Sequence, residues 1–126
     1  MDLGIAGRTA ILCASSAGLG RGCAEALAQA GARIILNGRN AEKLEATAAA
    51  IRQSTGAEVI AVAADVGTEA GRQALLAAAP EADILVNNNA GPPLRPFEDL
   101  DADKIRAGLE SNLVTPTLLI LSLIHI

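Results

Sequence analysis

A short turn rich in glycine and serine, CASSAGLG (residues 13–20), carries the residue types with the clearest chemical potential. It lies between an apolar run and a stretch with helical spacing. Gly18 and Gly20 would let the backbone approach an anion closely, and the N-terminus of the following helix would supply free N–H groups and a positive dipole end. Ser15 and Ser16 can donate hydroxyl hydrogen bonds to a phosphate. In this context the pattern favours a phosphate-binding turn over glycines that only permit tight strand–helix packing.

The elements that must position this turn alternate between short apolar runs and longer helical patterns. Strands are predicted at 8–14, 33–37, 57–65 and 83–87, and helices at 18–32, 41–54, 69–79 and 101–120. Asn40 and Thr68 are predicted N-caps, and Pro116 is predicted to bend the last helix. Apolar strands separated by helices form parallel sheets covered on both faces, with right-handed crossovers. The pattern therefore predicts an α/β, Rossmann-type doubly wound sheet with strand order 3-2-1-4.

The composition limits the class of protein to which the chain can belong. The chain has 126 residues, of which 51% are hydrophobic and 19% charged, enough for the core of one globular domain. Its net charge is −4 and its Lys and Arg residues are scattered, so no nucleic-acid partner is expected. Cys13, Cys23 and one His lack metal-site spacing, so no metal is expected and both thiols are interpreted as reduced and buried. The apolar run 113–126 is shorter than the roughly 18–20 residues of a membrane span. The sequence predicts a cytoplasmic protein with no membrane partner.

The turn resembles the Thr-Gly-x-x-x-Gly-x-Gly segment of the classical short-chain dehydrogenase/reductase family. Gly18 and Gly20 match its last two glycines, whereas Cys13 and Ala14 replace its Thr and first Gly. Alanine resists the positive φ that glycine permits, so the turn departs from the family pattern at Ala14. The resemblance implies that this turn binds the cofactor through Ser15, Ser16, Gly18, Leu19 and Gly20.

Three further segments carry the same resemblance. Asp65 and Val66, at the end of the third predicted strand, match the family's adenine-binding position. NNNAG (residues 87–91) resembles the Asn-Asn-Ala-Gly segment after the fourth strand. Counting without gaps from Asp83 assigns the motif to residues 87–90, and counting by motif assigns it to residues 88–91; the first is preferred because it preserves strand length. The cofactor-binding residues implied here are Asp65, Val66, Asn87, Asn88, Ala90 and Gly91. Asn112 matches the Asn of the family's Asn-Ser-Tyr-Lys tetrad.

The end of the second predicted strand indicates which nicotinamide cofactor is used. An acidic residue there would bind the ribose hydroxyls of NAD and repel a 2′-phosphate. The sequence instead has Gly38 followed by Arg39, whose guanidinium can bind a phosphate through two hydrogen bonds. NADP(H) is therefore expected in preference to NAD(H).

The resemblance implies an oxidoreductase that transfers a hydride to or from a carbonyl or secondary alcohol. In the family a Ser and a Tyr-x-x-x-Lys pair complete the tetrad, but this chain contains no Tyr. Asn112 is thus the only catalytic candidate, and the chain is expected to be inactive alone. GPPLRPF (residues 91–97) is consistent with members similar to 3-oxoacyl-carrier-protein reductases. When full length, the protein is expected to form a dimer or tetramer and to act on a small molecule.

Two other functions fit parts of the pattern. One is a non-catalytic dinucleotide-binding or interaction module that is naturally this short. The other is a related epimerase or dehydratase, which needs the same Tyr and Lys. The coding sequence beyond codon 120 distinguishes enzyme from module, because only the enzyme requires a frame that continues into Tyr-x-x-x-Lys.

The chain ends in LSLIHI (residues 121–126), which holds its only histidine, His125. A family member would continue its helix into a polar segment and a fifth strand. The hexapeptide is instead what the sequencing-adapter sequence CTGTCTCTTATACACATC encodes in one frame. We therefore interpret residues 1–120 as the N-terminal part of one Rossmann domain, with a sheet truncated after the fourth strand and its following helix, and residues 121–126 as a non-native tail. With the fourth strand as an unpaired edge, the chain is expected to be marginally stable or to aggregate.

Overall fold

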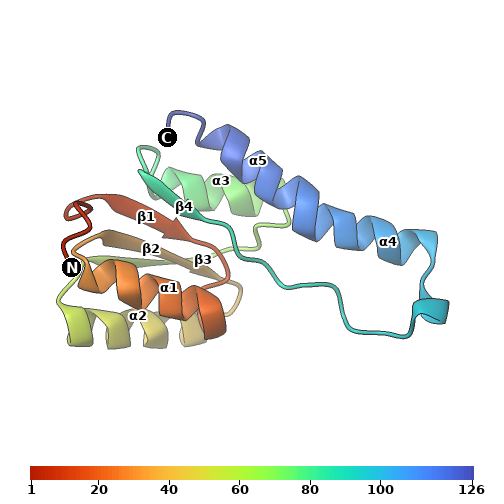
Figure 1. The fold of residues 1–126 in the computed structure, drawn as a ribbon, viewed down its shortest axis with the longest axis horizontal. Coiled ribbons are helices and arrows are strands. Elements are labelled where there is room, and N and C mark those ends of the chain that lie inside the picture. The colour runs from red at the N-terminus through yellow and green to blue at the C-terminus, as the bar shows by residue number, and fades with distance from the viewer.

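The computed structural model describes residues 1–126 as a single four-stranded parallel sheet flanked by helices (Figure 1). The strands are β1 (Thr9–Leu12), β2 (Arg33–Gly38), β3 (Val59–Ala63) and β4 (Ile84–Val86). The helices are α1 (Gly18–Gln29), α2 (Ala41–Thr55), α3 (Glu69–Ala77), the single 3₁₀ turn η1 (Phe97–Asp99), α4 (Ala102–Leu109), the π-helical turn η2 (Glu110–Val114) and α5 (Thr115–Ser122). The strand order is β3-β2-β1-β4, which confirms the order predicted from the sequence.

Alternate residues of the two central strands point to opposite faces of the sheet. On one face, Leu12 and Leu36 pack with the buried side chains of α1 and α2. On the other, Ile11 and Ile35 pack with those of α3 and α5, so helices cover both faces (Figure 1). Leu12 lies opposite Leu36 in the β1–β2 register, and this alignment brings the carboxyl ends of the strands to one edge.

The predicted caps of α2 and α3 are confirmed. The Asn40 side chain accepts a hydrogen bond from the Lys43 backbone N–H at 2.8 Å, and Thr68 accepts one from the Gly71 N–H at 3.0 Å. Each cap satisfies a backbone donor that has no partner within the first helical turn. The sequence therefore sets where both helices begin.

The helical region predicted at 101–120 is present over 102–122, where α4, η2 and α5 follow one another without a break. The irregularity lies before the proline, in the π-helical turn Glu110–Val114, and α5 then continues to Ser122. Pro116 is the second residue of α5, and it lies inside the continuous helical stretch, directly after the π-helical turn. No helix is long and apolar enough to cross a membrane.

Two residues of the segment 121–126 contact the body of the domain. Leu123 is 3% exposed and packs in the same cluster as Leu119 and Leu75, and the His125 Nε2 lies 2.9 Å from the Ala82 carbonyl oxygen. The sequence interpretation left this segment out of the fold. In the structure it covers part of the α3 face of the sheet.

Candidate functional site

The turn after β1 adopts the left-handed conformation at two positions. Ala14 has φ +46° and is the only non-glycine residue with positive φ, and Gly18 has φ +58°. A Cβ added at Gly18 would contact nothing within 4 Å, so this glycine is required by the backbone conformation rather than by crowding. Ala14 therefore takes the φ sign that the family's glycine allows, despite its side chain.

Gly20 is required for a different reason. A Cβ there would lie 2.5 Å from the Ala14 carbonyl oxygen and 2.9 Å from Nδ2 of Asn88. The first turn of α1 thus packs directly on the backbone of the preceding turn. Gly18 leaves open space beside the helix N-terminus, whereas Gly20 permits tight packing of the helix on the strand end.

Ser15 does not have the position that a phosphate ligand needs. Its side chain is fully buried, and its hydroxyl lies within hydrogen-bond distance of the carbonyl oxygens of Leu12 and Asn37, at 2.9 and 3.2 Å. The same oxygen accepts the Asn37 backbone N–H at 3.0 Å. Because these protein partners use both its donor and its acceptor capacity, Ser15 fixes the turn against β2. Ser16 lines the adjoining cleft instead, and Thr47 of α2 donates to its carbonyl oxygen at 2.9 Å.

Asn37, which the sequence reasoning did not single out, joins the ends of three strands. It is 2% exposed at the end of β2. Its Oδ1 accepts the Ala14 N–H at 3.4 Å, and its Nδ2 donates to the carbonyl oxygens of Val62 and Ala64 at 3.2 and 3.0 Å. A buried polar side chain must find such partners. The signal in the sequence was an amide residue directly after the apolar run of a central strand.

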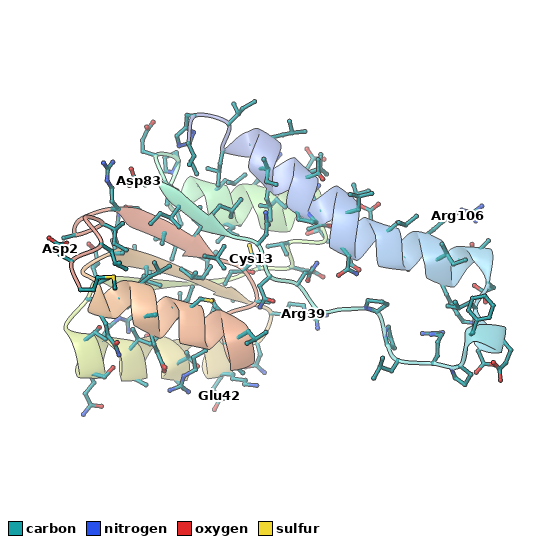
Figure 2. All side chains as sticks on the ribbon, viewed as in Figure 1. Asp2, Cys13, Arg39, Glu42, Asp83 and Arg106 are labelled. Carbon is teal, nitrogen blue, oxygen red and sulfur yellow. The ribbon has the colours of Figure 1, made fainter.

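A cleft of about 310 Å³ opens along this edge of the sheet. It collects residues from the turn, the ends of β2 and β3, the loop after β4, and the π-helical turn: Ala14, Ser16, Asn37, Gly38, Arg39, Ala64, Asp65, Val66, Gly67, Asn89, Ala90 and Ser111. Of the residues predicted to bind cofactor, Ser16, Arg39, Asp65, Val66 and Ala90 therefore share one cleft. Figure 2 shows Arg39 at the carboxyl ends of the strands and Asp83 at the opposite end.

Two charged side chains of this cleft, Arg39 and Asp65, remain exposed. Arg39 is exposed and takes part in none of the six ion pairs of the structure. Gly38 is buried, and a Cβ there would lie 3.3 Å from Leu44 Cδ1 and 3.4 Å from Ser16 Cβ. A carboxylate could not be added at position 38 without moving these neighbours. Asp65 accepts the Gly67 N–H through Oδ1 at 2.9 Å, and its side chain remains exposed.

The three asparagines after β4 contact different elements. Asn87 is exposed, Asn88 donates through Nδ2 to the Ala14 carbonyl oxygen at 3.3 Å, and Asn89 donates to the Ser111 carbonyl oxygen at 2.8 Å. Asn88 thereby ties the loop to the turn, and Asn89 ties it to the π-helical turn. Gly91 lies farther along, on a cavity of about 570 Å³ between this loop and α4.

Cys13 lies where β1 meets the turn and is 1% exposed. Burial raises the pKa of its thiol to about 11, and a hydrogen bond from the Asn88 backbone N–H partly opposes this rise. The thiol is therefore neutral at physiological pH and serves as an apolar core group. Cys23 was also predicted to be buried, but it is exposed on the outer side of α1; both cysteines are free.

The two remaining predicted residues occupy separate places. Asn112 is exposed, and its Nδ2 donates to the Gly108 carbonyl oxygen at 3.0 Å and to the Ser111 hydroxyl at 2.8 Å. It lines a second cavity, of about 260 Å³, together with Asn87 and Asn88. Leu19 is 83% exposed at the start of α1. The structure thus brings Asn112 close to the loop after β4 and leaves Leu19 outside all three cavities.

A parallel sheet of order β3-β2-β1-β4, with a crevice at the carboxyl ends of its strands, defines a Rossmann-type α/β protein. The family model for short chain dehydrogenase matches residues 8–125. The chain belongs to the short-chain dehydrogenase/reductase family.

Curated relatives and solved structures agree with this assignment. The chain is 38% identical over 114 residues to L-xylulose reductase of Cavia porcellus, covering 90% of this chain and 44% of the relative. It is 43% identical over 89 residues to the uncharacterized oxidoreductase YvaG of Bacillus subtilis, covering 70% and 34%. The crystal structure of L-sorbose reductase from Gluconobacter frateurii, complexed with NADPH and L-sorbose, has a TM-score of 0.89 at 31% identity and covers 98% and 48%. The chain spans less than half the length of each of these relatives.

Proposed function

We propose that this chain binds NADP(H) and forms the cofactor-binding part of an oxidoreductase that acts on a carbonyl or secondary alcohol. The observation that carries the proposal is the cleft at the strand ends, where the exposed Arg39 follows Gly38 and no carboxylate is present at either position. The L-sorbose reductase related to this chain was crystallised with NADPH, which supports the same cofactor.

The residues of the cleft fit the parts of a dinucleotide. Backbone N–H groups around Gly18 and the N-terminus of α1 would bind the pyrophosphate, because they carry a partial positive charge and no side chain covers Gly18. Arg39 would bind the 2′-phosphate, and the exposed Asp65 carboxylate and Val66 would contact the adenine. The bound nucleotide would supply the hydride.

The remaining predicted residues hold these groups in place or face the nicotinamide side. Asn88 fixes the turn through the Ala14 carbonyl oxygen, and Ser15 anchors it to β2. Asn87, Ala90 and Gly91 follow β4 along the loop that borders all three cavities. Asn112 supplies the one catalytic group that we assign. A chain without tyrosine offers no phenol for proton transfer to the substrate oxygen, so we expect nucleotide binding without turnover.

Titration with NADPH tests the binding proposal. The chain has no Trp or Tyr, so the nucleotide's own fluorescence can be followed without protein emission in the same range. We expect a saturable change in NADPH emission, reversed by an excess of NADP⁺. Emission that stays unchanged up to millimolar nucleotide would contradict the proposal.

A non-catalytic nucleotide-binding module is the second candidate, and the gathering of the predicted cofactor residues in one cleft supports it equally. Both candidates predict nucleotide binding, so the titration does not separate them. The coding sequence does: a frame that continues beyond codon 120 into Tyr-x-x-x-Lys supports the enzyme, and a stop codon supports the module.

We further propose a cytoplasmic location and assembly of the full-length protein into a dimer or tetramer. Two free cysteines support the location, since reducing compartments keep thiols unpaired. Assembly is supported by a row of large apolar side chains on α4 and η2, where Ile105, Leu109 and Leu113 are each more than half exposed. Light scattering of the full-length protein tests the assembly, and a monomeric mass would contradict it.

A further inference from the structure

The side chain of Arg52, near the end of α2, binds the backbone of the edge strand β3. Its Nε and Nη2 both donate to the carbonyl oxygen of Val59, at 2.9 and 2.7 Å. Its Nη1 donates to Oε1 of Glu45, seven residues earlier on the same helix, at 2.6 Å. Hydrogen bonds from an ionised donor are the stronger kind, so the guanidinium is held in place from two sides.

The Val59 carbonyl lies on the outer side of the sheet. β3 is the last strand in the order, so it pairs with β2 on one side only. Glu58, directly before Val59, accepts a hydrogen bond from the Ile34 N–H of β2 at 2.9 Å, and the register between the two strands is then regular to the end of β3. The backbone groups of successive residues in a strand alternate between its two sides. Those of Val59, Ala61 and Ala63 therefore face away from β2.

The sequence of β3 suits pairing with a copy of itself. It is VIAVA, without a charge or a proline, and three of its five residues are β-branched. Exposed strands of this composition are prone to pair edge to edge. In an antiparallel pair of two copies centred on Ala61, Val59 of each copy lies opposite Ala63 of the other, and such residues exchange two hydrogen bonds. Glu58 would lie opposite Ala64, so no like charges would meet.

We propose that Arg52 keeps β3 from pairing with the β3 strand of a second copy of the chain. It occupies the Val59 carbonyl oxygen, which in that pair accepts the Ala63 N–H of the second copy. The guanidinium also places a charge at the edge, and charged side chains commonly protect strand edges in native proteins. Arg52, Glu45 and Val59 line none of the three cavities, so the proposal is independent of nucleotide binding.

Arg52→Met tests the proposal, because methionine removes the charge and the donors but keeps a long side chain. Light scattering over a range of protein concentrations measures the association of the 126-residue chain. We expect Arg52→Met to associate at a concentration at least about tenfold lower than the unmodified chain, since no charged hydrogen bond then competes for the Val59 carbonyl. Association at the same concentration as the unmodified chain would overturn the proposal.

Arg21→Met is the matched control. Arg21 pairs with Glu25 on α1 at 2.7 Å, and its side chain is 43% exposed, compared with 40% for Arg52. Its guanidinium bonds to no strand, so its loss should leave the association concentration within about twofold of that of the unmodified chain. If Arg21→Met associates as readily as Arg52→Met, the lost charge and not the β3 edge controls association, and the proposal is overturned.

Adding Ala63→Pro to Arg52→Met identifies the edge that associates. The exposed Ala63 has its N–H directed away from β2, so proline removes no hydrogen bond of the sheet but removes the donor that the second copy supplies. We expect the double variant to associate at the same concentration as the unmodified chain. Association as strong as that of Arg52→Met alone would mean that the copies meet elsewhere, and would overturn the proposal.

Glu45→Gln tests the anchor of Arg52 without removing the arginine. Glu45 is exposed on the surface of α2, so the variant is expected to fold. Because the guanidinium is then held from one side only, we expect association at a concentration about two to three times lower than for the unmodified chain. Glu25→Gln breaks the corresponding pair on α1 and should cause no change. Equal behaviour of Glu45→Gln and Glu25→Gln would overturn the proposal.

Discussion

The first half of the sheet and the last helical region differ sharply in how they are held. The central strand β2 buries Ile34, Ile35 and Leu36 completely, and the Asn37 side chain joins three strand ends by accepting one hydrogen bond and donating two. By contrast, α4 has no buried residue, and β4 pairs with β1 along one edge only. The cleft with the predicted cofactor residues is built largely on the well-packed part. The residues predicted to bind the cofactor therefore lie on the well-packed sheet, whereas the exposed apolar side chains lie on α4 and η2.

Truncating one isoleucine in each region should show the largest difference. Ile34 is fully buried in β2, and Ile105 is 51% exposed on α4. We expect Ile34→Ala to lower the free energy of unfolding by about 2–5 kcal/mol, because it leaves a cavity between the sheet and its helices. Ile105→Ala should change it by about 0.5 kcal/mol or less. Urea unfolding followed by far-ultraviolet circular dichroism measures both changes. Equal losses in the free energy of unfolding would contradict the difference in packing between β2 and α4.

A pair of glycines on α1 tests whether the turn is packed as tightly as the structure shows. Gly20→Ala places a Cβ 2.5 Å from the Ala14 carbonyl oxygen, so the turn must shift. We expect a loss of about 1–3 kcal/mol in stability and NADPH binding weakened by about tenfold. At Gly22 an added Cβ contacts nothing within 4 Å, so Gly22→Ala should stabilise the helix by about 0.5–1 kcal/mol. Urea unfolding and NADPH titration of both variants measure these effects. If Gly20→Ala binds NADPH as tightly as the unmodified chain, the turn after β1 does not form part of the nucleotide site.

The smallest effect is expected in acid, at two aspartates on the surface: the half-buried Asp83 and the exposed Asp101. The pKa of Asp83 lies below its ordinary value of 3.8 because the Thr9 backbone N–H and the Arg8 side chain donate to it, joining β4 to β1. A lowered folded pKa means that the stabilisation is present above the unfolded value and is lost as the pH falls through the folded value. Asp83→Asn should therefore flatten the decline of the urea midpoint below about pH 4.

Asp101 is the control for this acid effect. Its pKa is lowered mainly by hydrogen bonds from the side chain and backbone of Lys104 at the start of α4, with a smaller contribution from the charge of Arg95. Asparagine caps helices as well as aspartate does, so Asp101→Asn should leave the midpoint for global unfolding unchanged at each pH. The opposite result is a urea midpoint that declines less in acid for Asp101→Asn but not for Asp83→Asn. It would mean that the hydrogen bonds at the start of α4, and not those between β4 and β1, stabilise the fold.

The sheet could be predicted from the sequence because its signals are local. Apolar runs, the caps at Asn40 and Thr68, and the right-handed crossover rule were enough for the strand order. The strands were predicted too long. The strand predicted at 8–14 spans only Thr9–Leu12, because the turn bends the backbone at Ala14. Hydrophobic periodicity continues into a turn, whereas strand pairing does not.

The details of the site depend on contacts between distant segments, and these were not visible in the sequence. Ser15 differs from a phosphate ligand because the β1–β2 register places Asn37 beside its hydroxyl, 22 positions away along the chain. Likewise, the hydrogen bond from Asn89 to the Ser111 carbonyl oxygen joins residues that lie 22 positions apart along the chain. Motif spacing indicated which residues gather at the cleft, and only the packing shows which side chains remain available to a ligand.

The selectivity of Arg39 tests the central claim most directly. The dissociation constants of NADPH and NADH should be measured for the unmodified chain, for Arg39→Ala, and for Arg106→Ala, whose guanidinium pairs with Asp103 on α4. We expect the unmodified chain and Arg106→Ala to bind NADPH at least about tenfold more tightly than NADH, since a charged hydrogen bond contributes about 1.5–3 kcal/mol. Arg39→Ala should reduce this preference to about twofold or less. A preference that is absent from the unmodified chain, or that survives in Arg39→Ala, would contradict the assignment of this cleft to NADP(H).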